Sequence, residues 1–159
     1  MLKIKLICVG KLKEKEFSSL VNEYKKRLGA FCNIEIEEIA EERLPSDPSD
    51  AQILDALETE AAAINKSIPS GSHIISLCVE GSQCDSVAFS RKINDISLRS
   101  SKLCFIIGGS NGLSDSIKQK SNDKMSFSKM TFPHHLFRIM LLEQIYRAFM
   151  IQSGKAYHK

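Results

Sequence analysis

The stretch 103–112 reads LCFIIGGSNG and contains the clearest structural signal in the chain. Five apolar residues in a row predict a strand buried on both faces, as in the middle of a parallel sheet. Two glycines follow the apolar run directly, and a third stands at position 112. Because glycine has no Cβ, a ligand can approach the backbone closely there. The stretch therefore predicts a buried strand that ends in either a binding loop or a tight turn.

Similar patterns extend outward from this stretch in both directions. Further strands are predicted at 3–9 and 73–79 from apolar runs, at 34–39 from alternation, and at 125–130 as a short strand or extended loop. Helices are predicted at 17–28, after Ser49, after Ser86, from Ser114, and from about 134 to 152. Strands that alternate with helices predict one α/β domain over residues 1–159, with a mostly parallel sheet and helices on both faces.

Several residues predict where these elements begin and end. Ser49 and Gln52 have the spacing of a capping box, and Ser86 is expected to cap the next helix. Gly81 is expected to end the strand that starts at 73. Pro133 is expected to be the first residue of the last helix, because proline needs no N–H there.

Composition excludes several classes of protein. The chain has 159 residues, 43% hydrophobic and 26% charged, as in an ordinary soluble domain. No apolar run reaches the roughly 18 residues that a membrane span needs, so we expect no membrane association and a cytoplasmic location. The opening MLKIKLICVGKLKEK has no small-residue cleavage site and reads as a strand rather than a signal peptide. The five cysteines contain no C-x-x-C, which argues against a disulfide framework and against a metal site.

Charge is distributed unevenly along the chain. Residues 1–33 carry eight Lys/Arg against three Glu, and residues 101–159 carry nine Lys/Arg against three acids. Residues 34–60 carry ten acids against one Arg. Two basic ends around an acidic middle suit a polyanionic partner, although solvated faces would give the same pattern.

The common catalytic motifs are absent from the sequence. The glycines at 108–112 do not fit the dinucleotide fingerprint G-x-G-x-x-G, and there is no P-loop, H-E-x-x-H or G-x-S-x-G. His134 and His135 are adjacent on a helix and point about 100° apart, so we do not expect them to share a metal. Arg138 lies one turn after His134, and both are expected to face the loop at 127–132. Arg147 is expected either to pair with Glu143 or to contact a ligand.

Three predicted strand ends are candidates for a ligand site. They lie at 77–81, 108–112 and 127–132. In open α/β sheets, ligands bind beyond the carboxyl ends of the strands. The chain ends on Tyr157, His158 and Lys159, which offer a stacking ring, a base and a cation, or else form a frayed end.

Three segments together resemble one family of enzymes. They are IIGGSNGL at 106–113, SFSKMTFPHHLFRIMLLEQIYRAF at 126–149, and the terminal AYHK. They closely resemble the bacterial large-subunit rRNA pseudouridine methyltransferase H family of the SPOUT, or α/β-knot, superfamily. The resemblance extends over the whole chain and includes IKLICVGKLKEK and EYKKRLG.

The resemblance implies a homodimer of α/β subunits with a C-terminal trefoil knot. It implies methyl transfer from S-adenosylmethionine to N3 of a pseudouridine in helix 69 of 23S rRNA, within the assembled 70S ribosome. It implies a cofactor pocket formed by Leu77, Gly108, Phe127, Ser128, Lys129, Met130, Thr131 and Phe132. The family usually has an acidic residue after Leu77; here that position is Cys78, and Glu80 follows two positions later.

The implied reaction requires removal of a weakly acidic proton from N3 of the target base. The resemblance and the composition of the tail suggest His158 as base or proton relay, with Tyr157 stacking on the base or orienting it. Arg147 would stabilise charge or hold a phosphate. Two other functions fit the same residues: a ribosome- or RNA-binding module without catalysis, and a small-molecule enzyme that binds phosphate at the glycine turn.

Overall fold

The computed structural model describes residues 1–157 of the chain. The strands are β1 (Lys3–Val9), β2 (Asn33–Ile39), β3 (His73–Ser82), β4 (Lys102–Ile107) and β5 (Asp123–Met125). The helices are α1 (Lys15–Leu28), α2 (Asp50–Ser67), α3 (Ser86–Arg99), α4 (Asp115–Lys120) and α5 (His134–Gln152). None of the helices in this part of the chain is both long and apolar enough to cross a bilayer.

The five strands form one sheet in the order β2-β1-β4-β3-β5, and all neighbouring pairs are parallel. β4 lies at the centre, where Phe105 pairs with Leu6 of β1 on one side and Ile75 of β3 on the other. Residues 103–107 are all buried. The buried parallel strand predicted from LCFII is therefore confirmed.

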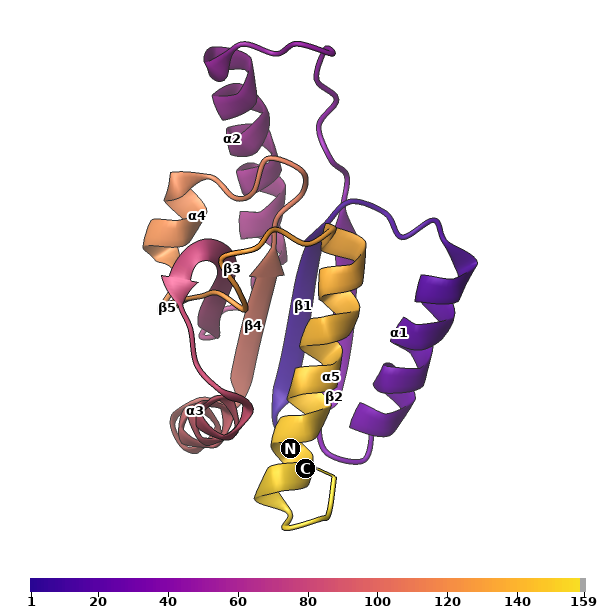
Figure 1. Ribbon diagram of the computed structural model, residues 1–159. Coiled ribbons are helices and arrows are strands. Elements are labelled where there is room, and N and C mark those ends of the chain that lie inside the picture. The colour runs from indigo at the N-terminus through magenta and orange to yellow at the C-terminus, as the bar shows by residue number, and fades with distance from the viewer. Residues whose placement is uncertain (158–159) are drawn as a thin grey trace.

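Helices cover both faces of the sheet, as expected (Figure 1). On one face, α1, α3 and α5 pack over alternate strand residues such as Leu6 and Phe105. On the other face, α2 and α4 pack over the residues between them, such as Ile7 and Ile106. Alternate strand residues point to opposite faces, and burial of both sets gives the strands their continuous apolar runs.

The ends of the helices confirm one capping prediction and correct two. Ser49 and Gln52 form the expected capping box. The cap of α3 is Asp85 rather than Ser86: the Asp85 carboxylate accepts the N–H of Ala88 at 2.7 Å. Ser86 is the first helical residue and donates to Gln144 of α5 instead. Pro133 precedes α5 as its N-cap and is not its first helical residue.

The end of β3 differs from the prediction that Gly81 terminates it. β3 continues to Ser82, and both Leu77 and Ser82 pair with Met125 of β5. In Figure 1 the ribbon at the end of β3 curls over beside β5. A Cβ at position 81 would lie 2.5 Å from the Met125 carbonyl carbon, so only glycine allows this approach. The chain at Met125 is thus held between two points of β3.

Candidate active site

A pocket of about 360 Å³ lies at the carboxyl ends of β3 and β4. Three segments form most of its wall: 77–80 near the end of β3, 107–113 from the last residue of β4, and 125–128 with 130–132 from the last residue of β5. Lys118 of α4, with His134 and Phe137 of α5, completes it. The three strand ends singled out in the sequence therefore meet at one site, because parallel strands bring their carboxyl ends to the same edge.

Most of the residues that the resemblance assigns to a cofactor pocket line this one. They are Leu77, Gly108, Phe127, Ser128, Met130, Thr131 and Phe132. The eighth, Lys129, is exposed and does not line it. Met130 lines the pocket at its mouth, since 73% of its surface is exposed.

Gly108 and Gly112 shape the turn after β4. A Cβ at Gly108 would lie 2.3 Å from the carbonyl oxygen of Gly112, far inside van der Waals contact. Gly112 has a φ of +76°, which side chains other than glycine rarely adopt. The N–H of Gly112 donates to the carbonyl of Gly109 at 3.1 Å and closes the turn. The glycines thus form a tight turn, and that turn is also part of the pocket wall.

The loop after β5 is held by its own hydroxyl groups. Ser126 Oγ donates to the Ser128 carbonyl at 2.8 Å, and Ser128 Oγ accepts the N–H of Met130 at 3.0 Å. The Phe127 ring packs edge-on against Phe137 of α5, with centroids 4.7 Å apart. These contacts fix the backbone of the loop over the strand ends.

Glu41 supports the pocket from outside and was not singled out in the sequence. Its Oε1 accepts the backbone N–H of Ser110 at 2.8 Å. Burial raises the pKa of its carboxyl, but the Ser110 N–H and the imidazoles of His134 and His135 outweigh that effect, so the pKa is lowered. Glu41 comes from the loop after β2, and no local pattern indicates a contact 69 residues away.

His134 and Arg138 take different positions on α5. His134 lines the pocket, and burial, followed by the charge of His135, lowers its pKa, so its imidazole is neutral near pH 7. Arg138 does not face the 127–132 loop, and that expectation is wrong. It is 2% exposed and donates to Glu38 at 2.9 Å and to the Gly10 carbonyl at 3.1 Å.

A second cavity of about 670 Å³ adjoins the pocket and shares the residues 125–128 and Phe132 with it. Glu143 of α5 lines this cavity. It accepts from Arg147 Nη2 at 2.7 Å and from Tyr157 Oη at 3.3 Å. The pairing of Arg147 with Glu143 is therefore confirmed.

Arg147 also lies over the Tyr157 ring, with its guanidinium carbon 4.8 Å from the centroid. Burial, and then the Glu143 charge, raise the pKa of Tyr157. The phenol therefore stays protonated as a hydrogen-bond donor. The predicted role of His158 lies outside the described residues. Within residues 1–157, no group of three or more His, Cys, Asp or Glu side chains could hold a metal ion.

Comparisons with known proteins show the family of the chain. A family model described as "Predicted SPOUT methyltransferase" matches residues 2–158. The chain belongs to the SPOUT methyltransferase family. Proteins named ribosomal RNA large subunit methyltransferase H are similar to it over nearly their full length. One from Leuconostoc mesenteroides is 48% identical over 98% of this chain and 99% of its own. One from Streptococcus uberis is 48% identical over 99% and 100%.

A solved structure shares the fold of this SPOUT family member at low sequence identity. It is described as a probable methylase family protein from Haemophilus influenzae Rd KW20. The TM-score is 0.59 and the identity 11%, over 98% of this chain and 70% of the other. The family model and the named relatives confirm the family resemblance carried by 106–113, 126–149 and the tail.

Proposed function

We propose that this protein transfers a methyl group from S-adenosylmethionine to large-subunit ribosomal RNA. The observation that carries the proposal is the pocket at the ends of β3 and β4, lined by seven of the eight positions that the family resemblance assigns to the cofactor. The names of the relatives from Leuconostoc mesenteroides and Streptococcus uberis support the substrate.

The chemistry of the pocket fits an adenosine cofactor. Its volume of about 360 Å³ lies within the usual range for small-molecule sites, roughly 300 to 1,000 Å³. Leu77, Ile107 and Phe132 offer apolar contact for a flat ring, and the backbone of the glycine turn and of the 126–132 loop offers polar groups for its edge. When bound, the cofactor supplies an electrophilic methyl group. The residues of the chain orient it and exclude water.

The specific target that we propose is N3 of a pseudouridine in helix 69 of 23S rRNA, within the assembled 70S ribosome. The basic ends of the chain would meet the rRNA, and the second cavity beside the cofactor pocket offers room for a base. We expect weak activity on naked rRNA fragments, because a chain of this size has little surface for selecting one nucleotide. Efficient methylation of a short free hairpin would contradict this restriction to the ribosome.

Three residues near the C-terminus would handle the target base. Glu143 accepts from both Arg147 and Tyr157 and so fixes the phenol beside the second cavity. Tyr157 would stack on the base or orient it, Arg147 would stabilise charge or hold a phosphate, and His158 would accept the N3 proton directly or through a relay. Truncation after Ala156, with single-turnover methylation measured at saturating cofactor, tests these roles. Unchanged turnover would exclude the tail from the chemistry.

The assembly and topology implied by the resemblance are part of the proposal. We infer a homodimer: Leu20 on α1 is 46% exposed, and Tyr24 of the same helix lines the open second cavity. We also infer a trefoil knot. The pairing of both Leu77 and Ser82 of β3 with Met125 of β5 supports it, and α5 follows this point in the chain. A cytoplasmic location follows from a ribosomal substrate.

Calorimetry with S-adenosylmethionine separates this function from a ribosome-binding module without catalysis. The proposed enzyme binds the cofactor without RNA, because the pocket is formed by one chain. A non-catalytic module needs no cofactor and would show no binding heat. An enzyme that uses the glycine turn for phosphate would also show no binding heat with S-adenosylmethionine.

A further inference from the structure

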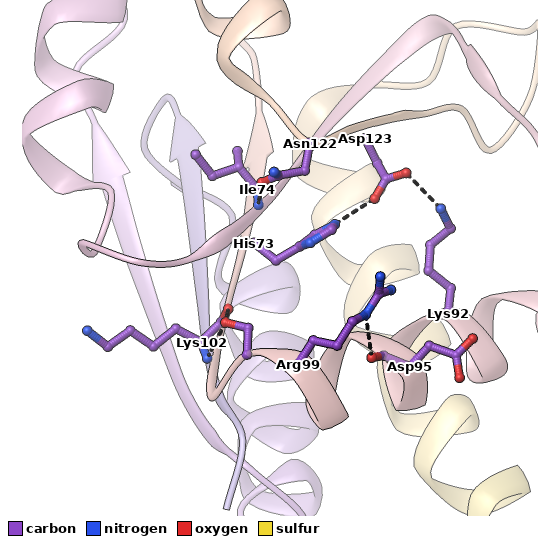
Figure 2. A network of polar contacts seen from close by, with 9 residues as sticks. His73, Ile74, Lys92, Asp95, Arg99, Lys102, Asn122 and Asp123 are labelled. Carbon is purple, nitrogen blue, oxygen red and sulfur yellow. Dashed lines mark hydrogen bonds and ion pairs between the residues drawn. The ribbon is translucent and has the colours of Figure 1, made fainter.

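A second polar groove lies at the opposite ends of the strands from the candidate active site. It has a volume of about 560 Å³ and lies between α3 and the first residues of β3 and β5. Its side chains come from segments far apart in the sequence. Figure 2 shows how His73, Lys92, Arg99 and Asp123 lie toward one another. The ionisable side chains that line the groove are His73, Arg91, Lys92, Asp95, Arg99 and Asp123. The proposed methyl transfer uses none of them.

Asp123 lines the groove, and its carboxylate is already paired with two side chains. One carboxylate oxygen bonds His73 Nε2 at 2.6 Å, and the other accepts from Lys92 Nζ at 2.9 Å. Burial raises the pKa of Asp123, but the contacts with Lys92 and His73 outweigh it and the pKa is lowered. Asp123 is therefore ionised and paired, and it holds Lys92 and the His73 ring in place.

Arg91 and Arg99 supply cationic groups that no carboxylate of residues 1–157 engages. Together with Asp95 they are spaced four residues apart on α3 and share one face of the helix. Arg99 uses only Nε in a hydrogen bond, to the Asp95 carbonyl at 3.2 Å. Figure 2 shows its two terminal amino groups directed into the space between His73 and Lys92. Within residues 1–157, neither arginine forms an ion pair.

Asn122 adds a neutral donor to this set. Its Oδ1 accepts the N–H of Ile74 at 2.7 Å, which leaves the amide nitrogen as the free end of a side chain that lines the groove. Guanidinium groups bind phosphate oxygens with paired N–H donors, and an amide adds a single one. Arg91, Lys92 and Arg99 outnumber the two acids among the lining residues, so the groove has a net positive charge that suits a phosphate.

We propose that this groove binds the phosphodiester backbone of the rRNA substrate near the target nucleotide, an inference that rests on the proposed function. β3 links the two sites: His73 lines the groove and Leu77 lines the pocket. Four residues of strand span about 13 Å, which is about four nucleotides of a stacked strand at roughly 3.4 Å each. α3 connects the groove to the second cavity, because Arg99 lines the groove and Ser86 lines the second cavity.

The test is the double variant Arg91→Ala/Arg99→Ala against the matched control Arg43→Ala/Lys66→Ala. The control removes two exposed cations that do not line the groove, and it has the same net charge as the double variant. Methylation of 70S ribosomes is measured as a function of enzyme, ribosome and salt concentration. For the double variant we expect KM for ribosomes to rise about tenfold, with kcat and cofactor affinity unchanged. The slope of log(kcat/KM) against log salt should fall by about 1.4, as for two lost single-strand phosphate contacts.

Equal kinetics and equal salt slopes for the two double variants would overturn the proposal. A second outcome would also overturn it: the wild type binds inorganic phosphate, the Arg91/Arg99 variant does not, and ribosome kinetics are unchanged. The groove would then be a small-anion site rather than an rRNA site. If the wild type methylates no ribosome, the proposed function fails instead. The groove is then judged by fluorescence anisotropy with a single-stranded RNA, for which the same tenfold loss is expected.

Discussion

Glu41 reaches the pocket from a loop 69 residues before the turn that it holds, where its carboxylate accepts the Ser110 N–H. A hydrogen bond to a charged acceptor contributes about 1.5 to 3 kcal/mol. We therefore expect Glu41→Ala to weaken S-adenosylmethionine binding at least tenfold in calorimetry. It should also lower the pKa of His134 in an NMR titration, because the Glu41 charge raises that pKa.

The adjacent Glu42→Ala is the matched control for Glu41→Ala. Glu42 is exposed, and its contact with Glu60 is made by its backbone N–H, which the substitution retains. Both measurements should stay at their wild-type values in this variant. Equal cofactor affinity for the two variants would show that the carboxylate does not support the glycine turn.

Arg138 tests stability rather than binding, because it is buried and faces away from the pocket. Arg138→Met keeps much of the volume but leaves Glu38 without its partner. Glu38 is partly exposed, so we expect a loss of about 2 kcal/mol in urea unfolding near pH 7, below the full cost of a broken buried pair. A loss below about 0.5 kcal/mol would contradict a structural role for this ion pair.

The same pair gives a pH dependence of known sign. Burial raises the pKa of Glu38, but the bonds from Arg138 and the Leu12 N–H outweigh it, so the folded-state pKa is lowered. A lowered pKa contributes stability above the unfolded-state pKa, and this is lost as the pH falls through the folded-state value. The stability difference between wild type and Arg138→Met should therefore shrink below about pH 4. A difference that grows on acidification would contradict the assignment.

At the scale of elements, the turn after β4 links the shape of the backbone to binding. Gly108→Ala places a Cβ 2.3 Å from the Gly112 carbonyl oxygen, and neither the Cβ nor the oxygen can move away without a shift of the backbone. We expect the turn to open and S-adenosylmethionine affinity to fall at least tenfold. Gly29→Ala is the control, because Gly29 has an ordinary helical φ and an added Cβ would meet its nearest atom at 3.4 Å. Unchanged cofactor affinity in Gly108→Ala would show that the shape of the turn does not affect cofactor binding.

Elements whose signal is local could be predicted from the sequence. The apolar run at 103–107 and the helix at 134–152 depend on hydrophobic patterns within the segment, and both are confirmed. The cap of α3 could not be chosen locally, because Asp85 and Ser86 are neighbouring residues that both favour that position. The structure uses Asp85, which leaves Ser86 free to bond α5.

Features that depend on distant partners escaped prediction. Gly81 looked like a strand terminator, but it is required by the approach of Met125. The helical spacing predicts the wrong side of the helix for Arg138, because its partner, Glu38, is 100 residues away. The cofactor positions came from family resemblance, and the structure adds Glu41 and His134 beside them.

At the scale of the whole molecule, the proposed homodimer predicts separate effects on assembly and on cofactor binding. Leu20→Asp places a charge on the exposed face of α1, where we expect the two copies to meet. Light scattering should give twice the chain mass of 17.8 kDa for the wild type and the single mass for the variant. Cofactor binding should persist, since one chain forms the pocket. Leu54→Asp on α2, where Leu54 is 61% exposed, is the control and should stay dimeric. A wild-type protein that is monomeric at working concentrations would contradict the dimer.

The central claim is that the pocket at the ends of β3 and β4 serves methyl transfer to ribosomal RNA. The most direct test is nucleoside mass spectrometry of 23S rRNA from the source organism with the coding sequence deleted, followed by add-back of the purified wild-type protein or Gly108→Ala with S-adenosylmethionine. We predict loss of one N3-methylpseudouridine from helix 69 on deletion, restoration by the wild type, and little restoration by the variant. An unchanged modification profile in the deletion strain would contradict the claim.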